Sequence, residues 1–345
     1  MSTVRSSVDI FPKIHKSSSS DRSLPCRSWN APRAAHYREM QGLTSLIGTS
    51  VTVQSMVFGN TGVASGSGVG FTRDPATGEN RAYIDFILNA QGEDVVAGRH
   101  VADDSDRSIA AIPDLAHRLQ RVRRKLEATF RDAQDFEFTV EEGRLWMLQT
   151  RTAQRTAWAA LRIVCDLVDE GVIDIETAVE RLKPYALDSI SRLQLADESG
   201  TDRLGRGTPS SDGVGSGRLA LDSEAARQFS RDGDPVVLVR EEASTDDVAG
   251  LTLCRGVVTA TGARTSHAAV VARQLGLACV IGCEGLVLDV DQRTVQIGDS
   301  QIHEGEWITV DGATGALYRG ELQLRQEYPE DLIRRVEEWT MSLAD

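Results

Sequence analysis

The spacing of hydrophobic and polar positions changes several times along the chain, and each change predicts a different element. Two runs, "VTVQSMVFG" at 51–59 and "RAYIDFIL" at 81–88, have the apolar and β-branched composition of strands. They flank "TRDPATGEN", which is rich in turn-forming residues. A helical period follows over residues 108–133, with a basic, solvated face.

The second half of the chain repeats this alternation. "FEFTVEEGRLWMLQTR" at 136–151 predicts a β-hairpin, and residues 156–182 carry a helical period. A polar, Gly-rich stretch at 197–217 is the best candidate for a domain boundary. Beyond it, short strand-like and helical runs alternate, which predicts a compact α/β domain of about 110 residues. "EDLIRRVEEW", near the end of the sequence, predicts a helix that leads toward a part absent from this sequence.

Composition narrows the class of protein. A length of 345 residues, with 41% hydrophobic and 26% charged residues, indicates a globular chain of two or three domains. A net charge of −13 argues against sequence-independent nucleic-acid binding. Neither a signal-peptide pattern nor an apolar run of membrane-spanning length is found, so we expect a cytoplasmic chain without a membrane partner.

Two further features concern the cysteines and the first residues. The five cysteines are scattered and odd in number, which favours buried free thiols over a zinc site. Residues 1–25 contain "KSSSSDRS" and lack any apolar period, so we expect a disordered leader there.

One face of the predicted hairpin gathers charged and amide side chains. This follows because side chains alternate between the two faces along a strand. The odd-numbered face holds Asp135, Glu137, Thr139, Met147, Gln149 and Arg151. With 141–143 as the loop, Val140 is expected to pair with Arg144, and Asp135 with Gln149. Carboxylate and amide oxygens suit Mg²⁺, and a guanidinium suits phosphate oxygens. A Mg–nucleotide site and a solvated face with an incidental ion pair both explain this parity, and a one-residue slip would remove the grouping.

A second group stands where a helix should begin. "HAAVVARQL" predicts a helix that Gly276 ends, with Thr265 or Ser266 as its N-cap. A helix N-terminus disfavours imidazolium and favours a phosphoryl group, so we expect His267 to be neutral and able to carry phosphate. Arg264 and Ser266 are close enough in sequence to support that charge. An ordinary histidine at a helix start is the alternative interpretation.

Six ordered segments together resemble the pyruvate, phosphate dikinase family. The similarity runs from about residue 28 to about residue 320 and is carried by "SWNAPRAAHYREM", "VTVQSMVFGN", "GVGFTRDPATGE", "LNAQGEDVVAG", "FEFTVEEGRLWMLQTR" and "VLVREEASTDDVAGL…GVVTATGARTSHAAVVARQLG". The family combines an ATP-grasp nucleotide-binding domain, a swivelling phosphohistidine domain and a barrel that binds pyruvate or phosphoenolpyruvate.

The resemblance implies an α/β and α+β multidomain chain. Its expected parts are a leader at 1–25, the C-terminal part of an ATP-grasp domain at 26–155, a helical linker at 156–197, a swivelling β/β/α phosphohistidine domain at 198–322 and a helical tail at 323–345. The first part of the ATP-grasp domain and the barrel have no counterpart in this sequence.

The resemblance also implies roles for the hairpin residues. Glu137 and Gln149 match the family's Mg–ATP contacts, and Arg151 matches a phosphate contact. Asp135 matches an ATP-site position less closely. This agrees with the grouping that parity gives.

Residues around the helix start match the family with exceptions. His267 matches the histidine that carries the phosphoryl group, and Thr265 matches a threonine that a regulatory kinase modifies in some members. Ser266 favours the dikinase branch, because related enzymes generally have a cysteine there. Arg264 ends a "GAR" segment where the family usually has two glycines and a methionine, and Asp212 replaces a common proline.

The expected function is that of a dikinase-like phosphotransferase. With Mg²⁺, ATP and phosphate, it would carry a phosphoryl group on a histidine toward pyruvate and form phosphoenolpyruvate. Two alternatives stay open. The chain is a phosphocarrier module or gene remnant that needs a partner such as a separate barrel chain, or it is a related phosphotransferase with another acceptor.

Overall fold

The structure is a computed structural model in two compact units, residues 1–57 and 58–345. It describes residues 28–30, 35, 38, 45, 48, 55–96, 105–197, 200–243, 247–262, 264 and 266–343. The described part of the first unit includes a 3-10 helix, η1 (Ser28–Asn30). The predicted leader at 1–25 lies outside the described residues. The mixed α/β class is confirmed in the second unit.

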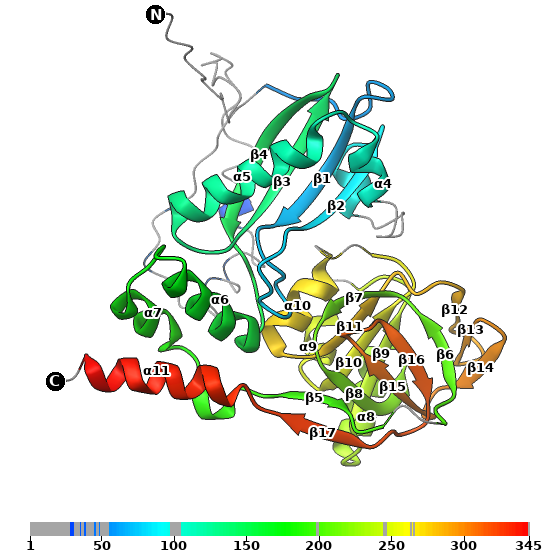
Figure 1. Ribbon diagram of the computed structural model, residues 1–345. Coiled ribbons are helices and arrows are strands. Elements are labelled where there is room, and N and C mark those ends of the chain that lie inside the picture. Colours follow the sequence, from blue (N-terminus) through cyan, green and yellow to red (C-terminus); the bar gives the residue numbers. More distant parts are fainter. Residues whose placement is uncertain are drawn as a thin grey trace, which may run out of the picture. The chain divides into compact units, whose positions relative to one another are not determined.

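A four-stranded antiparallel sheet begins the second unit (Figure 1). In spatial order its strands are β2 (Tyr83–Leu88), β1 (Gly66–Phe71), β3 (Gln134–Glu141) and β4 (Arg144–Thr152). Gly68 and Gly70 on β1 stand opposite Phe138 and Phe136. A Cβ atom at Gly68 would lie 2.5 Å from the Phe138 ring, so these strands pair closely only because glycine leaves room for the rings.

The elements around this sheet match the sequence pattern only in part. The predicted strand at 81–88 is confirmed as β2, whereas residues 55–58 of the run at 51–59 lie in no strand. Helix α3 (Gly92–Val96) is short, and the helix expected over 108–133 is two helices, α4 (Ser105–Ala110) and α5 (Leu115–Phe130). The break falls at Pro113, which lacks an N–H and disfavours helical geometry in the residue before it.

Three helices and a short 3-10 turn form a second cluster. They are α6 (Ala157–Asp169), α7 (Ile175–Leu182), η3 (Leu187–Ser189) and α11 (Glu330–Ser342). The helical period at 156–182 is therefore split, at Gly171, whose φ of +68° ends α6. The helix predicted from "EDLIRRVEEW" is confirmed as α11, which packs on α6 and α7 and buries Val336 (Figure 1).

A two-stranded antiparallel ribbon connects this cluster to the residues from 200 to 322. The chain enters through β5 (Arg192–Leu195) and returns through β17 (Leu324–Glu327). Arg192 joins both strands to the following domain, since it pairs with Glu327 at 2.8 Å and with Asp212 at 2.6 Å. The two passages of the chain therefore lie side by side.

Residues 203–319 contain an eight-stranded mixed sheet. Its strands are, in spatial order, β6 (Arg203–Arg206), β16 (Ala316–Arg319), β15 (Trp307–Asp311), β8 (Val214–Ala220), β9 (Val236–Arg240), β10 (Cys254–Thr259), β11 (Ala278–Ile281) and β7 (Thr208–Ser211). The Gly-rich stretch at 197–217 therefore supplies strands and is no simple linker. A Cβ at Gly215 would lie 2.3 Å from the Arg255 carbonyl oxygen, so this glycine marks a close approach of two backbones.

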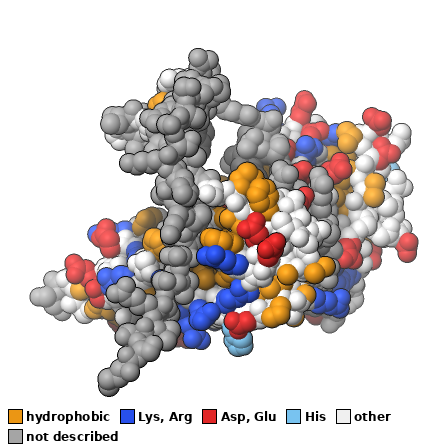
Figure 2. Space-filling model, turned by 90° about the horizontal axis from the view of Figure 1, so that it is seen from above, with side chains coloured by type: hydrophobic (Ala, Val, Ile, Leu, Met, Phe, Trp, Pro, Cys, Tyr) orange, Lys and Arg blue, Asp and Glu red, His pale blue; other side chains and the backbone are white. Residues whose placement is uncertain are grey.

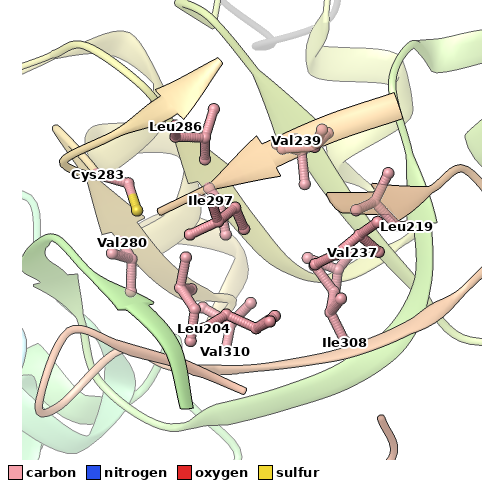
Figure 3. Packing of buried hydrophobic residues seen from close by; sticks show 14 of the residues in the cluster. Leu204, Leu219, Val237, Val239, Val280, Cys283, Leu286, Ile297, Ile308 and Val310 are labelled. Carbon is pink, nitrogen blue, oxygen red and sulfur yellow. The ribbon is translucent and has the colours of Figure 1, made fainter. Parts of the chain in front are cut away.

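Both faces of this sheet are covered. On one side lie α8 (Ser223–Arg231), α9 (Val248–Leu251) and α10 (His267–Leu275). On the other lies a three-stranded sheet, β12 (Leu286–Asp289), β13 (Thr294–Ile297) and β14 (Ser300–His303). The strand residues alternate between these layers. Val237 and Val239 face the small sheet (Figure 3), whereas Val236 and Leu238 pack with the helices.

Four cysteines are confirmed as free, buried thiols. Burial raises the pKa of Cys165 to about 11 and those of Cys254, Cys279 and Cys283 to about 12. Cys26 lies outside the described residues.

The surface in Figure 2 intersperses acidic and basic side chains among the residues drawn in colour. Among the described helices, none combines the length and the apolar character needed to cross a membrane.

Candidate functional site

The β3–β4 hairpin turns more tightly than its sequence predicts. Glu142 and Gly143 both have positive φ, +49° and +78°, as in a two-residue hairpin turn with left-handed central residues. Val140 therefore pairs with Leu145, and the predicted partner Arg144 pairs with Glu141. The predicted three-residue loop is wrong by one residue.

A bulge then moves the register by one more residue. It lies between Glu137 and Phe138, and beyond it Glu137 pairs with Gln149 and Asp135 pairs with Arg151. The predicted pair of Asp135 with Gln149 is wrong, but two shifts of one residue restore the parity. Asp135, Glu137, Gln149 and Arg151 therefore do share one face. Met147 does not, because it pairs with Phe138 and is buried.

Strand β2 adds residues to the same face, because directly paired residues point to the same side of a sheet. One row across the sheet is Asp85, Val69, Glu137 and Gln149. The next row is Tyr83, Phe71, Asp135 and Arg151. We call these eight residues the polar sheet face.

The charges on the polar sheet face are unequally exposed. Arg151 Nε donates to both carboxylate oxygens of Asp135, at 2.9 and 2.7 Å. Burial raises the pKa of Asp135, and Arg151 partly opposes that rise. The Arg151 side chain keeps 54% of its surface exposed, so it remains open to a second anionic partner.

A metal ion would find two oxygen donors here. Glu137 is half-buried and its neighbour Gln149 is exposed. The described residues hold no cluster of three or more His, Cys, Asp or Glu side chains fit for a metal. Two protein oxygens suit Mg²⁺, which keeps several waters and takes further ligands from phosphate groups.

The start of α10 is built as its sequence predicts. Ser266 is the N-cap, and its Oγ accepts a long hydrogen bond of 3.5 Å from the Ala269 N–H. Gly276, with a φ of +68°, ends the helix. Helix α10 follows β10 and precedes the parallel strand β11, so His267, whose backbone alone is described, lies at the carboxyl edge of the strands. Thr265 lies outside the described residues.

A buried hydroxyl that sequence reasoning missed lies beside this helix start. Thr259 ends β10, and its Oγ1 has no hydrogen-bond partner among the described residues. A Cβ at Gly262 would lie 3.5 Å from both Ser266 Oγ and Thr259 Oγ1. Glycine therefore leaves space between two hydroxyl groups at the helix N-terminus.

Two arginines join α10 to the polar sheet face. Arg273 is buried, donates to the carbonyl oxygens of Ser210 at 2.9 Å and Arg264 at 3.0 Å, and lies 5.2 Å from the Phe71 ring centroid. Arg264 lies 3.8 Å above the Tyr83 ring and 3.7 Å from Asp85 Oδ1. The two candidate groups of the sequence therefore face each other.

Comparison with known proteins agrees with this geometry. Residues 23–114 match the family profile "Pyruvate phosphate dikinase, AMP/ATP-binding domain", and residues 233–315 match "PEP-utilising enzyme, mobile domain". Pyruvate, phosphate dikinase of Clostridium symbiosum is 41% identical over 315 residues, which are 91% of this chain and 36% of that protein. The chain belongs to the pyruvate, phosphate dikinase family.

Plant members of the family are similarly related. The chloroplastic pyruvate, phosphate dikinase 1 of Arabidopsis thaliana is 43% identical over 299 residues, or 86% of this chain and 31% of that protein. The chloroplastic enzyme of Flaveria trinervia is 43% identical over 295 residues, or 85% and 31%. The chain thus spans about a third of the length of the curated relatives it matches.

The two family profiles divide the candidate site between them. The dikinase AMP/ATP-binding match contains Tyr83 and Asp85, and the mobile-domain match contains Thr259, His267 and Arg273. The hairpin at 134–152 lies between the two matches. The hairpin shares its sheet with β1 and β2, which the first match covers.

Proposed function

We propose that this dikinase-family chain carries an ATP-derived phosphoryl group on His267, toward pyruvate as the acceptor that forms phosphoenolpyruvate. One observation supports this most directly. The loop before α10 contacts the polar sheet face through Arg264, and that same face carries Glu137, Gln149 and Arg151. Donor and carrier would thus meet without a further element between them.

The proposed domain division follows from this. Residues 26–155 would be part of an ATP-grasp domain, 156–197 a helical linker, 198–322 a swivelling phosphohistidine domain and 323–345 a helical tail. The ribbon of β5 and β17 supports this division, because it brings both connections of 198–322 to one place.

The polar sheet face would hold the nucleotide. Glu137 and Gln149 would bind Mg²⁺, which shields phosphate charge during transfer. Arg151 would contact a phosphate oxygen through its exposed edge while Asp135 holds its Nε. Asp135 would thereby orient Arg151.

The transfer itself uses the neutral imidazole of His267. A ring nitrogen attacks phosphorus, an N–P bond forms and the P–O bond to the nucleotide breaks, with its electron pair left on that oxygen. The proton on the other ring nitrogen passes to water. The N–H groups of the first turn of α10 favour the added negative charge. A phosphate on Thr265, placed there by a regulatory kinase, would oppose this step with about two further negative charges.

Labelling of the full chain tests the proposal. Incubation with Mg²⁺, phosphate and ATP labelled at its β- or γ-phosphate should give a phosphate that is acid-labile and stable to base. A second reaction should supply phosphoenolpyruvate and the separately expressed barrel of the Clostridium symbiosum relative. If neither route gives acid-labile phosphate on a folded chain, the proposed function is wrong.

Glu137→Gln should weaken the binding of Mg–ATP about tenfold, because it removes a charge that faces the cation. Binding of ATP in the presence of EDTA should change little. Isothermal titration calorimetry measures both affinities. Glu142→Gln is the matched control, since it removes the same charge from the turn of the same hairpin. Equal affinities for the two variants would contradict the assignment of Glu137.

A further inference from the structure

We propose that Arg264 is an electrostatic latch that holds the loop before α10 against Tyr83 and Asp85 of the polar sheet face. The inference rests on the proposed function, since it concerns the position from which His267 would accept phosphate. Its evidence is the set of contacts between residues 58–155 and residues 200–322.

The described contacts between these stretches include an ion pair, two hydrogen bonds and the stacking of Arg264 and Arg273 on aromatic rings. The Arg264 guanidinium stacks on the Tyr83 ring and lies 3.7 Å from Asp85 Oδ1. The Tyr83 hydroxyl donates to the Pro209 carbonyl oxygen at 2.8 Å, and Gln274 donates to Gln154 at 3.0 Å. An interface within one chain that includes polar contacts of this kind allows its domains to move relative to each other. A single charged contact therefore has a large share in the docking equilibrium.

The backbone of Arg264 is held in place by a residue of α10. Its carbonyl oxygen accepts a hydrogen bond from the buried Arg273, which also binds the Ser210 carbonyl oxygen. The backbone of the latch is thereby fixed while the guanidinium projects to β2. The ion pair is incompletely satisfied, because Arg264 Nε and Asp85 Oδ1 are buried without hydrogen-bond partners. The Arg264 backbone also hydrogen-bonds the Asp85 carboxylate, so the main chain of the loop as well as the guanidinium contacts β2.

Distance measurements on the full chain test the latch without nucleotide. Single-molecule energy transfer can use dyes at Arg121→Cys on α5 and Arg227→Cys on α8, two exposed sites, with Cys26→Ser; four native thiols are buried. Arg264→Met should lower the ratio of docked to undocked molecules about three- to tenfold. Raising NaCl from about 0.05 M to about 0.5 M should do the same to the parent and little to the variant.

A mutant cycle isolates the pair. Asp85→Asn should act like Arg264→Met, and the double variant should open no further than the more open single variant. Arg255→Met, on an exposed site of β10, is the control and should leave the ratio unchanged. The latch is wrong if Arg264→Met behaves as Arg255→Met does, or if every variant shows one salt-independent distance.

The outcome is independent of the labelling result. A salt-sensitive docking ratio without any acid-labile phosphate would retain the latch and reject the proposed function. Normal labelling with an unchanged docking ratio would reject the latch alone.

Discussion

Replacing His267 by asparagine is expected to lower the acid-labile phosphate on the chain at least about 100-fold, because the nucleophile itself is lost. The asparagine amide resembles imidazole in shape but has no basic nitrogen to attack phosphorus. Ser266 remains as the N-cap, so the helix start should persist. Scintillation counting after acid and base treatment measures the loss.

Two controls separate this result from trivial causes. His303→Asn changes an exposed histidine of the same domain and should label as the parent does. Trypsin cleaves after Arg264 and Arg273, so mass spectrometry of the peptide 265–273 locates the phosphate. Acid-stable phosphate on Thr265 or Ser266, with none on His267, would contradict the assignment of the carrier.

Local chemistry made the start of α10 predictable. Ser266 and Gly276 specify the two ends through their own side chain and backbone, and the structure places both where the sequence does. No distant residue is needed for either signal. The same holds for β2, whose apolar run survives as a strand at the edge of its sheet.

The hairpin could be predicted only in part, since register depends on the turn and on any bulge. Parity put Asp135 and Arg151 on one face, and this is correct only because two errors cancelled. The predicted loop was one residue too long, and the bulge after Glu137 was missed. Met147, between the bulge and the turn, reveals the errors because it lies on the other face. A bulge leaves no clear mark in an alternating sequence, so parity can identify a face only up to its first bulge.

The partners of the site arise from tertiary structure and have little local signal. Tyr83 and Asp85 join the polar sheet face only because β2 pairs with β1 in a particular register. Arg273 looks like an ordinary basic residue in the last turn of a helix, yet it is fully buried between Phe71 and two carbonyl oxygens. Their alternation put Tyr83 and Asp85 on one face of a strand but carried no information on which residues of other strands share that face.

Arg73→Met should lower the free energy of unfolding by about 3–5 kcal/mol, because it leaves a buried carboxylate without its counter-charge. The Arg73 side chain is fully buried and makes a two-pronged pair with Glu127 of α5, at 3.0 and 3.1 Å. It also binds Glu170, at the end of α6, at 2.6 Å. One guanidinium thus joins the loop after β1 to α5 and to the end of α6. Urea denaturation followed by circular dichroism measures the change.

Arg124→Met, on an exposed site of α5, is the control with the same change of side chain and should change stability by less than about 1 kcal/mol. A double variant, Arg73→Met with Glu127→Leu, should regain much of the stability, since it removes the carboxylate that Arg73 leaves unpaired. If the double variant is no more stable than Arg73→Met, the loss comes from packing or from Glu170, and the buried pair with Glu127 is not its cause.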